Sequence, residues 1–242
     1  MSISKKIIGY SLFICAALVS GQQPDFNAGR PGATETSTPV PKGFYQLESG
    51  GTYSGGTTGN IMMRTGITDR LEVRFSFDDL AAPPSSVYGG VMGGLMFKIR
   101  DESDRGPETA FVATVSVPNE GGLSFNGSEY NLIATFSKSI THLVSAGWSV
   151  GTTVYKHDIK QTSDVLYTAT LGYQLSEKTG VFIEMYGGSP SSDFNQITHT
   201  IDGGIMYQLH DIIQIDVNGG LAMSGEGEDP FFDIGFAYRL PN

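Results

Sequence analysis

Strict alternation of apolar and polar side chains constrains this 242-residue chain more than any other feature of its sequence. In the clearest example, residues 70–79, the apolar residues Leu71, Val73 and Phe75 are separated by single charged or hydroxyl residues. Successive side chains of a β-strand point to opposite faces of its sheet. The pattern therefore predicts strands with one apolar and one polar face.

The same period of two recurs along most of the chain, and no helical period follows the first 21 residues. We predict strands at residues 43–53, 59–68, 70–79, 87–100, 108–118, 128–138, 142–156, 163–175, 180–188, 196–209, 212–222 and 230–240. Short connections between strands alternate with mostly longer loops, and residues 157–162 are predicted to be one of the longer loops. The connection over residues 101–107 breaks this alternation, because it is long where a short turn is expected. An even number of strands of about ten residues, with short turns at one end and longer loops at the other, is typical of outer-membrane barrels.

The first 21 residues have the features of a secretory signal peptide. Lys5 and Lys6 precede an apolar run over residues 7–19, and the small residue Gly21 fits a cleavage site. The run is shorter than the roughly 20 residues of a membrane-spanning helix. No second long apolar run follows, and only helices and closed barrels satisfy the backbone in lipid. A membrane destination therefore requires a barrel.

Composition excludes several classes of function. The formal charge of −10 disfavours nucleic-acid binding, which needs a basic surface. A single cysteine, Cys15, rules out a disulfide framework. A secreted soluble β-sandwich also alternates in this way, but the polar face here carries few lysines. The outward aromatic residues gather near strand ends, as in interfacial girdles: Tyr45, Tyr53, Phe77, Phe97, Tyr130, Phe136, Tyr173, Tyr207, Phe232 and Tyr238.

Several stretches resemble a family of bacterial outer-membrane proteins. Residues 30–37 (RPGATETS) and 40–50 (VPKGFYQLESG) look like the opening of the meta-pathway phenol-degradation family, often labelled simply "transporter". Matches of the same kind lie at residues 64–74, 182–187, 214–219 and 235–239. Gly29 and Thr36 depart from the usual family pattern. The resemblance implies an outer-membrane channel for aromatic or other small hydrophobic cargo.

If the apolar side chains face lipid, the opposite set faces the lumen. It contains the charged residues Glu48, Arg64, Glu72, Arg74, Lys98, Arg100, Glu184, Asp202, Asp216, Asp233 and Arg239. Unpaired charges are costly in a confined interior, so acids and bases should pair across neighbouring strands. The set could form a constriction that selects solutes or a salt-bridged network that holds the barrel rigid. Both interpretations remain open from the sequence.

Residues 22–42 contain four prolines and no strand pattern. A linker is the simplest interpretation. Our sharper hypothesis is that the segment folds into the periplasmic mouth as a plug, with Arg30 and Glu35 pairing with charges of the lumen.

The last predicted strand resembles the C-terminal assembly signal of outer-membrane barrels, which implies the barrel-assembly machinery as a partner. The residues that carry the signal are Asp233, Gly235, Tyr238 and Leu240. The chain ends in Pro-Asn instead of an aromatic residue.

Catalytic and metal-binding patterns are weak. His199 lies on the lipid-facing side near the outer rim, where a barrel phospholipase needs its base, but Ile201 stands where that face could offer a serine. The acidic loop residues Glu226, Glu228 and Asp229 match no calcium motif. We therefore predict no enzyme, cofactor or metal. The expected protein is a twelve-stranded antiparallel barrel over residues 43–240, embedded in the outer-membrane lipid of a Gram-negative bacterium and passing small solutes. The alternatives are a non-transporting structural barrel and, less favoured, a soluble binding module.

Overall fold

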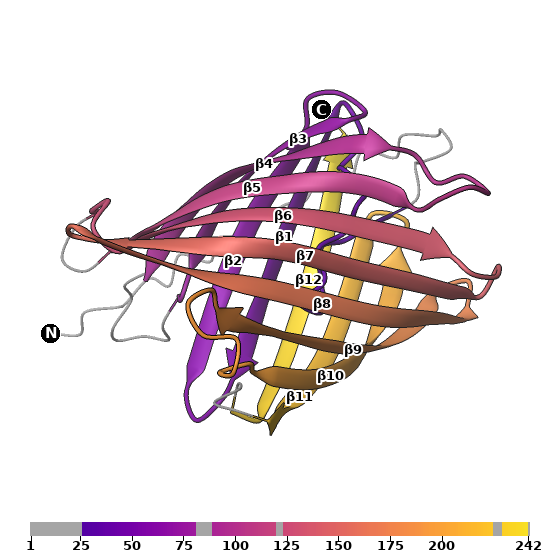
Figure 1. Ribbon diagram of the computed structural model, residues 1–242. Coiled ribbons are helices and arrows are strands. Elements are labelled where there is room, and N and C mark those ends of the chain that lie inside the picture. The colour runs from indigo at the N-terminus through magenta and orange to yellow at the C-terminus, as the bar shows by residue number, and fades with distance from the viewer. Residues whose placement is uncertain (1–25, 81–88, 120–122, 225–228, 242) are drawn as a thin grey trace, which may run out of the picture.

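A computed structural model describes residues 26–80, 89–119, 123–224 and 229–241. The predicted signal peptide, residues 1–21, and residues 22–25 of the Pro-containing segment lie outside this part of the chain. The described residues form twelve antiparallel strands that close into a barrel in chain order (Figure 1). They contain no helix that is long and apolar enough to cross a membrane.

The strands follow the predicted segments closely, which confirms the predicted fold. They are β1 (Phe44–Tyr53), β2 (Thr57–Gly66), β3 (Leu71–Asp78), β4 (Gly90–Arg100), β5 (Glu108–Pro118), β6 (Ser128–Ser139), β7 (Val144–His157), β8 (Lys160–Ser176), β9 (Thr179–Pro190), β10 (His199–His210), β11 (Ile213–Ser224) and β12 (Phe231–Pro241). We call the end with the β2–β3, β4–β5, β6–β7, β8–β9 and β10–β11 connections the turn end, and the opposite end the loop end.

One predicted loop is wrong. The sequence indicated a longer loop over residues 157–162, but the ladder between β7 and β8 continues to His157 and Lys160. Asp158 and Ile159 alone connect the strands, and Asp158 has a φ of 53°. Asp tolerates this left-handed conformation better than most residues, so a tight hairpin turn can form here.

The first and last strands close the barrel. β1 pairs with β12 over its whole length, from Phe44 opposite Pro241 to Tyr53 opposite Phe232. Each of the other strands pairs with both of its neighbours in the sequence. Closure therefore leaves no open sheet edge, which is the condition for a sheet to reside in lipid.

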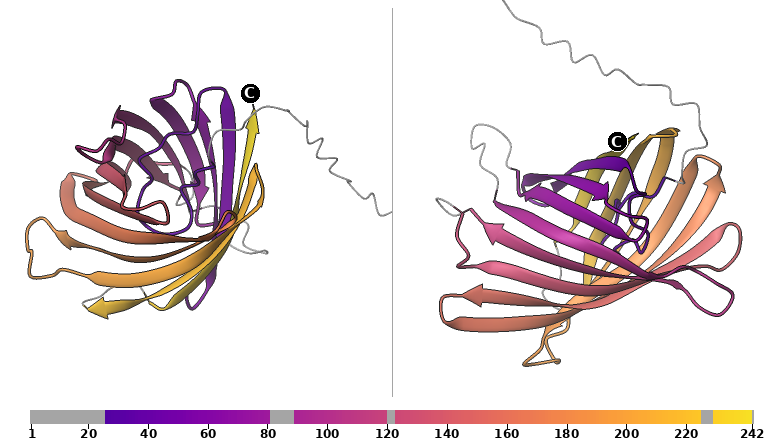
Figure 2. Two further views of the ribbon diagram at one scale, coloured as in Figure 1. Left: turned by 90° about the vertical axis from the view of Figure 1, so that its right-hand side faces the viewer. Right: turned by 90° about the horizontal axis from the view of Figure 1, so that it is seen from above.

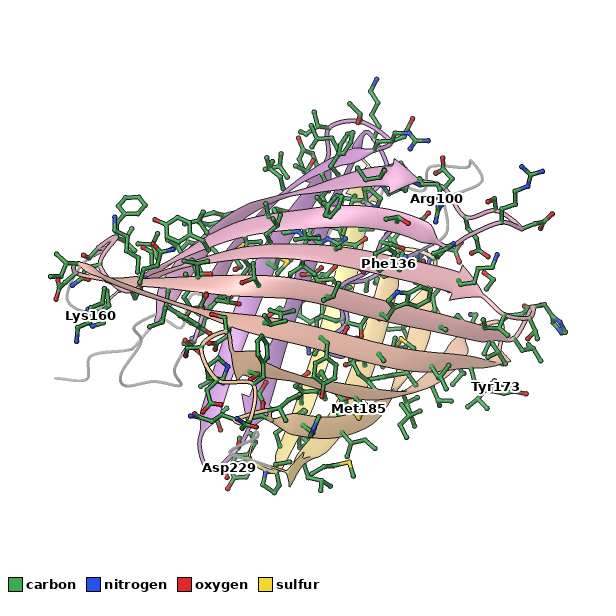
Figure 3. The ribbon with its side chains drawn as sticks, viewed as in Figure 1. Arg100, Phe136, Lys160, Tyr173, Met185 and Asp229 are labelled. Carbon is green, nitrogen blue, oxygen red and sulfur yellow. The ribbon has the colours of Figure 1, made fainter. Side chains whose placement is uncertain are left out.

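The two faces of the sheet differ as the alternation predicted. On β3, Val73 and Phe75 are exposed outside the barrel, whereas Glu72 and Arg74 are buried inside it. Figure 3 shows side chains such as those of Tyr173 and Met185 on the outer wall. An apolar outer surface around a polar interior is the arrangement of a membrane barrel.

The interior is filled mostly by polar side chains. A small apolar patch on the inner wall comprises Met96, Ala110, Val112 and the neighbouring Ile133, and Met92 and Ala237 are also buried apolar residues. The chain before β1 also lies inside the barrel, where the left view of Figure 2 shows it as an indigo trace crossing the interior. We call residues 26–43 the lumen segment.

Candidate functional site

The lumen segment starts near the turn end, beside β1. The amide of Gln46 donates to the carbonyl oxygen of Asn27 at 3.0 Å. The backbone N–H of Gly29 donates to Glu48 at 3.0 Å. At its other end the segment returns to β2, where the N–H of Gly43 donates to the carbonyl oxygen of Gly66 at 3.3 Å. The segment therefore begins and ends at the wall of β1 and β2 and crosses the lumen between.

Arg30 reaches farthest into the wall of β11 and β12. Its guanidinium forms ion pairs with Asp233 and, at 3.4 Å, with Asp216. Behind it lie Gly50 and Gly235, opposite each other in the β1–β12 ladder. A Cβ atom on either glycine would overlap the guanidinium. Two inward-facing glycines therefore form the slot that admits Arg30.

The middle of the lumen segment binds the opposite wall. The carboxylate of Glu184 on β9 accepts the N–H of Ala33 at 2.5 Å, the N–H of Thr34 at 2.7 Å and the hydroxyl of Thr34. The same hydroxyl lies 2.8 Å from that of Thr168 on β8. Farther along, the hydroxyl of Ser37 donates to Glu108 on β5 at 2.9 Å. These bonds hold the segment across the barrel.

A buried ion-pair network joins β1, β2 and β3; we define it as Glu35, Glu48, Arg64, Glu72 and Arg74. Arg64 is fully buried and donates to Glu48 at 2.7 Å and to both oxygens of Glu72 at 2.9 and 2.8 Å. Arg74 donates to Glu72 at 2.9 Å and to Glu35 of the lumen segment, also at 2.9 Å. Acids and bases alternate along the network, so every charged group in it contacts one of opposite sign.

Further contacts extend from the network to the lumen segment and to β12. The N–H of Val40 donates to Glu72 at 2.8 Å, which ties the end of the lumen segment to β3. On β12, Arg239 donates to Gln46 at 2.8 Å, and its guanidinium lies 4.7 Å from the ring centroid of Phe26. The same charged residues therefore join the strands of the barrel wall to one another and fix the lumen segment to that wall.

Two further candidate residues, Lys98 and Arg100, lie at the turn end. Lys98 forms ion pairs with Asp101 at 2.9 Å and with Glu108 at 3.3 Å. The hydrogen bond from Lys98 lowers the pKa of Asp101. The prediction that Arg100 lines the lumen is wrong, because its side chain is exposed and donates to the carbonyl oxygen of Pro107. A register shift between Lys98 and Arg100 breaks the alternation there.

The wall opposite the ion-pair network is acidic. We call Glu184, Asp202, Asp216 and Asp233, on β9 to β12, the acid wall; all four are buried. Glu184 and Asp202 stand directly opposite each other in the β9–β10 ladder. Arg30 of the lumen segment forms ion pairs with two members of this wall, Asp216 and Asp233.

Arg30 lies between two hollows of the lumen. A cavity of about 470 Å³ at the loop end is lined by Arg30, Asp202, Asn218, Asp233 and others. A smaller cavity of about 190 Å³ at the turn end is also lined by Arg30. The lumen segment lies between these two cavities, which we call the two chambers, and Arg30 also lines a third cavity of about 240 Å³ beside β6 to β9.

The sequence interpretation missed several of these groups. Glu108 faces inward on β5 by the same alternation that marked the other acids, so it could have been found. The amide carbonyl and N–H groups of residues 27–40 could not, because backbone contacts of an irregular segment leave no pattern. At the C-terminus, Tyr238 and Leu240 pair with Leu47 and Tyr45 of β1.

The remaining chemical candidates form no site in the described residues. His199 contacts the hydroxyl of Tyr167 through Nδ1. No group of three or more His, Cys, Asp or Glu side chains that could hold a metal occurs in residues 26–80, 89–119, 123–224 and 229–241. Of the acidic loop, Asp229 is exposed, while Glu226 and Glu228 lie outside the described residues.

Comparison with solved structures supports the fold. The barrel is similar to the NanC porin, with a TM-score of 0.62 and 11% identity over 81% of this chain and 100% of that one. It is similar to the KdgM porin in complex with disordered oligogalacturonate, with a TM-score of 0.60 and 10% identity over 80% and 98%. It also resembles the COG4313 outer membrane channel from Pseudomonas putida F1, with a TM-score of 0.59 and 13% identity over 84% and 98%.

Comparison of the sequence identifies the family. No curated protein matches the chain. A family profile described as "Putative MetA-pathway of phenol degradation" matches residues 28–240, which include most of the lumen segment and all but the last residue of the barrel strands. The chain therefore belongs to this family of outer-membrane β-barrel proteins.

Proposed function

We propose that this protein is an outer-membrane channel for passive or facilitated passage of small solutes. The observation that carries the proposal is the polar lumen with a cavity on either side of Arg30. Twelve strands enclose more space than the filled interior of an eight-stranded barrel and less than that of a sixteen-stranded porin. The lumen segment then forms the constriction, and movement of Arg30 connects the two chambers.

The solute is small, and we include aromatic molecules among the candidates because the family description names phenol degradation. The KdgM porin structure contains oligogalacturonate, which is an acidic sugar polymer. The acid wall would repel such a polymer here, so we do not extend that solute to this chain. Tyr186 and Phe231, which line the loop-end cavity, offer apolar contact to a ring.

A structural, non-transporting barrel is the second candidate. The observation that favours it is the number of anchors on the lumen segment, which has side-chain hydrogen bonds to β1, β3, β5, β6, β8, β9, β11 and β12. Such a segment would act as a permanent plug that stabilises the wall.

Deletion of residues 22–38, with the signal peptide kept, tests the two candidates in a planar lipid bilayer. If the segment is a constriction or plug, the deletion increases single-channel conductance. Unchanged conductance would refute the plug hypothesis. A wild-type protein that never conducts, beside a deletion variant that does, would favour the structural barrel.

A milder variant keeps the segment in place. Arg30→Gln removes the ion pairs to Asp216 and Asp233 and should increase conductance without loss of the barrel. Arg70→Gln is the matched control, because Arg70 forms an exposed ion pair with Asp101 at the turn end. Equal conductance of both variants and the wild type would count against a gate at Arg30.

We propose that residues 1–21 export the chain and are removed after Gly21, and that the barrel-assembly machinery inserts it into outer-membrane lipid. Asp233, Gly235, Tyr238 and Leu240 are the proposed assembly signal. Outer-membrane fractionation and mass spectrometry of the mature N-terminus test location and cleavage. Tyr238→Ala should reduce the assembled fraction; an unchanged fraction would refute the signal.

We propose that the protein is not an enzyme. The nearest arrangement to a catalytic one is His199, whose partner is Tyr167 instead of a serine. Phospholipid release by the purified protein, compared with a His199→Ala variant, tests this. Release that disappears in the variant would overturn the proposal.

A further inference from the structure

The loop-end cavity carries an excess of hydrogen-bond acceptors. Asp202 and Asp233 line it from the strand wall, and Asp229 lines it from the adjoining loop. Arg30 is the basic residue of this lining, and its guanidinium is already paired with Asp216 and Asp233. The cavity is therefore electronegative beyond what its own arginine compensates.

A second observation points to a ligand with hydrogen-bond donors. Asn218 lines the same cavity, is only 7% exposed, and its Oδ1 atom has no hydrogen-bond partner. Its Nδ2 atom donates to Asp202 at 3.4 Å, which leaves the oxygen as an acceptor without a donor. Behind the cavity, Oδ2 of Asp216 is likewise buried without a partner, as is the donor Nε of Arg30. Buried polar atoms without partners are costly, so a donor from a ligand would be favourable at Asn218.

The cavity also has an aromatic part. Tyr186 and Phe231 belong to its lining, together with the acidic groups. A cation gains from aromatic faces as well as from carboxylates. The volume of about 470 Å³ lies in the range of small-molecule sites.

We infer that the loop-end cavity binds a small organic cation, a primary ammonium attached to an apolar or aromatic group. The ammonium donates to Asn218 Oδ1 and to Asp202, and the apolar group contacts Tyr186 and Phe231.

The inference deepens the proposed function and rests on it, because a ligand at the loop end is a solute only if the barrel conducts. It predicts that the channel prefers cations and that an arylammonium ion is captured at the loop end before it passes Arg30.

Isothermal titration calorimetry on the full mature protein in detergent micelles tests the site. The probes are benzylammonium, neutral benzyl alcohol of similar shape, and benzoate. We expect benzylammonium to bind at least about tenfold more tightly than benzyl alcohol, which corresponds to one charge-assisted contact. Benzoate should not bind. Equal affinities for benzylammonium and benzyl alcohol would overturn the inference.

Variants locate the binding site. Asp202→Asn should weaken benzylammonium binding about tenfold, again the value of one charge-assisted contact. Asn218→Asp should strengthen it, because a carboxylate replaces an acceptor that has no partner. Asp211→Asn, in the exposed turn between β10 and β11, is the matched control and should change nothing. Because Asn218→Asp predicts a gain, a general folding defect cannot imitate the expected result. No gain in Asn218→Asp, or an effect of Asp211→Asn as large as that of Asp202→Asn, would overturn the assignment.

Bilayer recordings separate this inference from the proposed function. Benzylammonium added at the loop end should reduce open-channel current in the wild type and less in Asp202→Asn. Binding without any conductance would refute the channel and leave the cation site standing. Conductance without preferential binding of benzylammonium would refute the site and leave the channel standing.

Discussion

The sharpest test of the buried charges is the substitution Glu72→Gln. Glu72 is fully buried and accepts five hydrogen bonds, four from Arg64 and Arg74 and one from the N–H of Val40. Glutamine has nearly the same shape but places an NH₂ group where one carboxylate oxygen was. In either orientation of the amide, this group faces donors and removes at least two of the five bonds.

The substitution also removes the carboxylate that lies between two buried guanidinium groups. Arg64 retains Glu48, and Arg74 retains Glu35, but the carboxylate shared between the two arginines is gone. Removal of one partner from a buried ion pair costs about 3–5 kcal/mol, because the remaining charge stays desolvated. We expect Glu72→Gln to lower the free energy of unfolding by that amount.

Urea unfolding of the protein in lipid vesicles, followed by gel mobility of the folded form, measures this loss. Asp101→Asn is the matched control. Asp101 pairs with Lys98 and Arg70 but is largely exposed, so its loss should cost no more than about 1 kcal/mol. Amide hydrogen exchange provides a second measurement, because the Val40 N–H loses its acceptor and should exchange faster.

A loss in Glu72→Gln no larger than that in Asp101→Asn would refute the argument that the network is a buried, interdependent structure. Unchanged exchange at Val40 together with a large loss of stability would refute only the tie between network and lumen segment.

Three other predictions follow from single positions. Gly235→Ala places a methyl group against the guanidinium of Arg30, so it should lower the free energy of unfolding by about 1–3 kcal/mol and increase conductance. In the control Gly51→Ala, the new Cβ would have no neighbour nearer than 3.7 Å, so stability should change by less than about 0.5 kcal/mol. Equal conductance of the two variants would contradict the role of these glycines in admitting Arg30. The fluorescence of Trp148, the only tryptophan, should be quenched by brominated acyl chains and not by iodide, because Trp148 stacks on Phe136 on the outer wall; the reverse would place this face in water. Because the pKa of Asp101 is lowered in the folded protein, its ion pairs stabilise the fold above the ordinary pKa of Asp, and this stabilisation is lost as the pH falls through the lowered pKa. The difference in unfolding free energy between the wild type and Asp101→Asn, measured against pH, should therefore shrink in acid by at most about 1 kcal/mol.

The alternation of side chains was sufficient to predict the barrel. Membrane strands must place apolar groups outside, so in a strand such as β3 the alternation itself shows which side chains face lipid and which face the lumen. The prediction failed where backbone geometry departs from that period. The register shift at Arg100 turned its side chain out of the lumen, and the tight turn at Asp158 replaced an expected loop.

The sequence predicted that the charged residues of the lumen pair with opposite charges, but not which residues pair with which. Alternation assigns Glu48, Arg64 and Glu72 to one face, and the cost of buried charge requires that they pair. The path of the lumen segment, however, depends on irregular backbone and on glycines such as Gly50 and Gly235, whose role is to leave space. The space that such glycines leave for another side chain cannot be predicted from the sequence, because the only sign of it is the glycine itself.

The distribution of charge connects the two halves of the lumen. On β1 to β3, Glu48 and Glu72 each have a basic partner, so the ion-pair network can serve as a rigid support whether or not solute passes. On β9 to β12 the acid wall depends on Arg30, which comes from outside the sheet. In the proposed channel, a movement that withdraws Arg30 would open the path between the chambers and at the same time expose carboxylates to it. Opening and cation preference therefore have one physical cause, and a variant that withdraws this arginine should change both together.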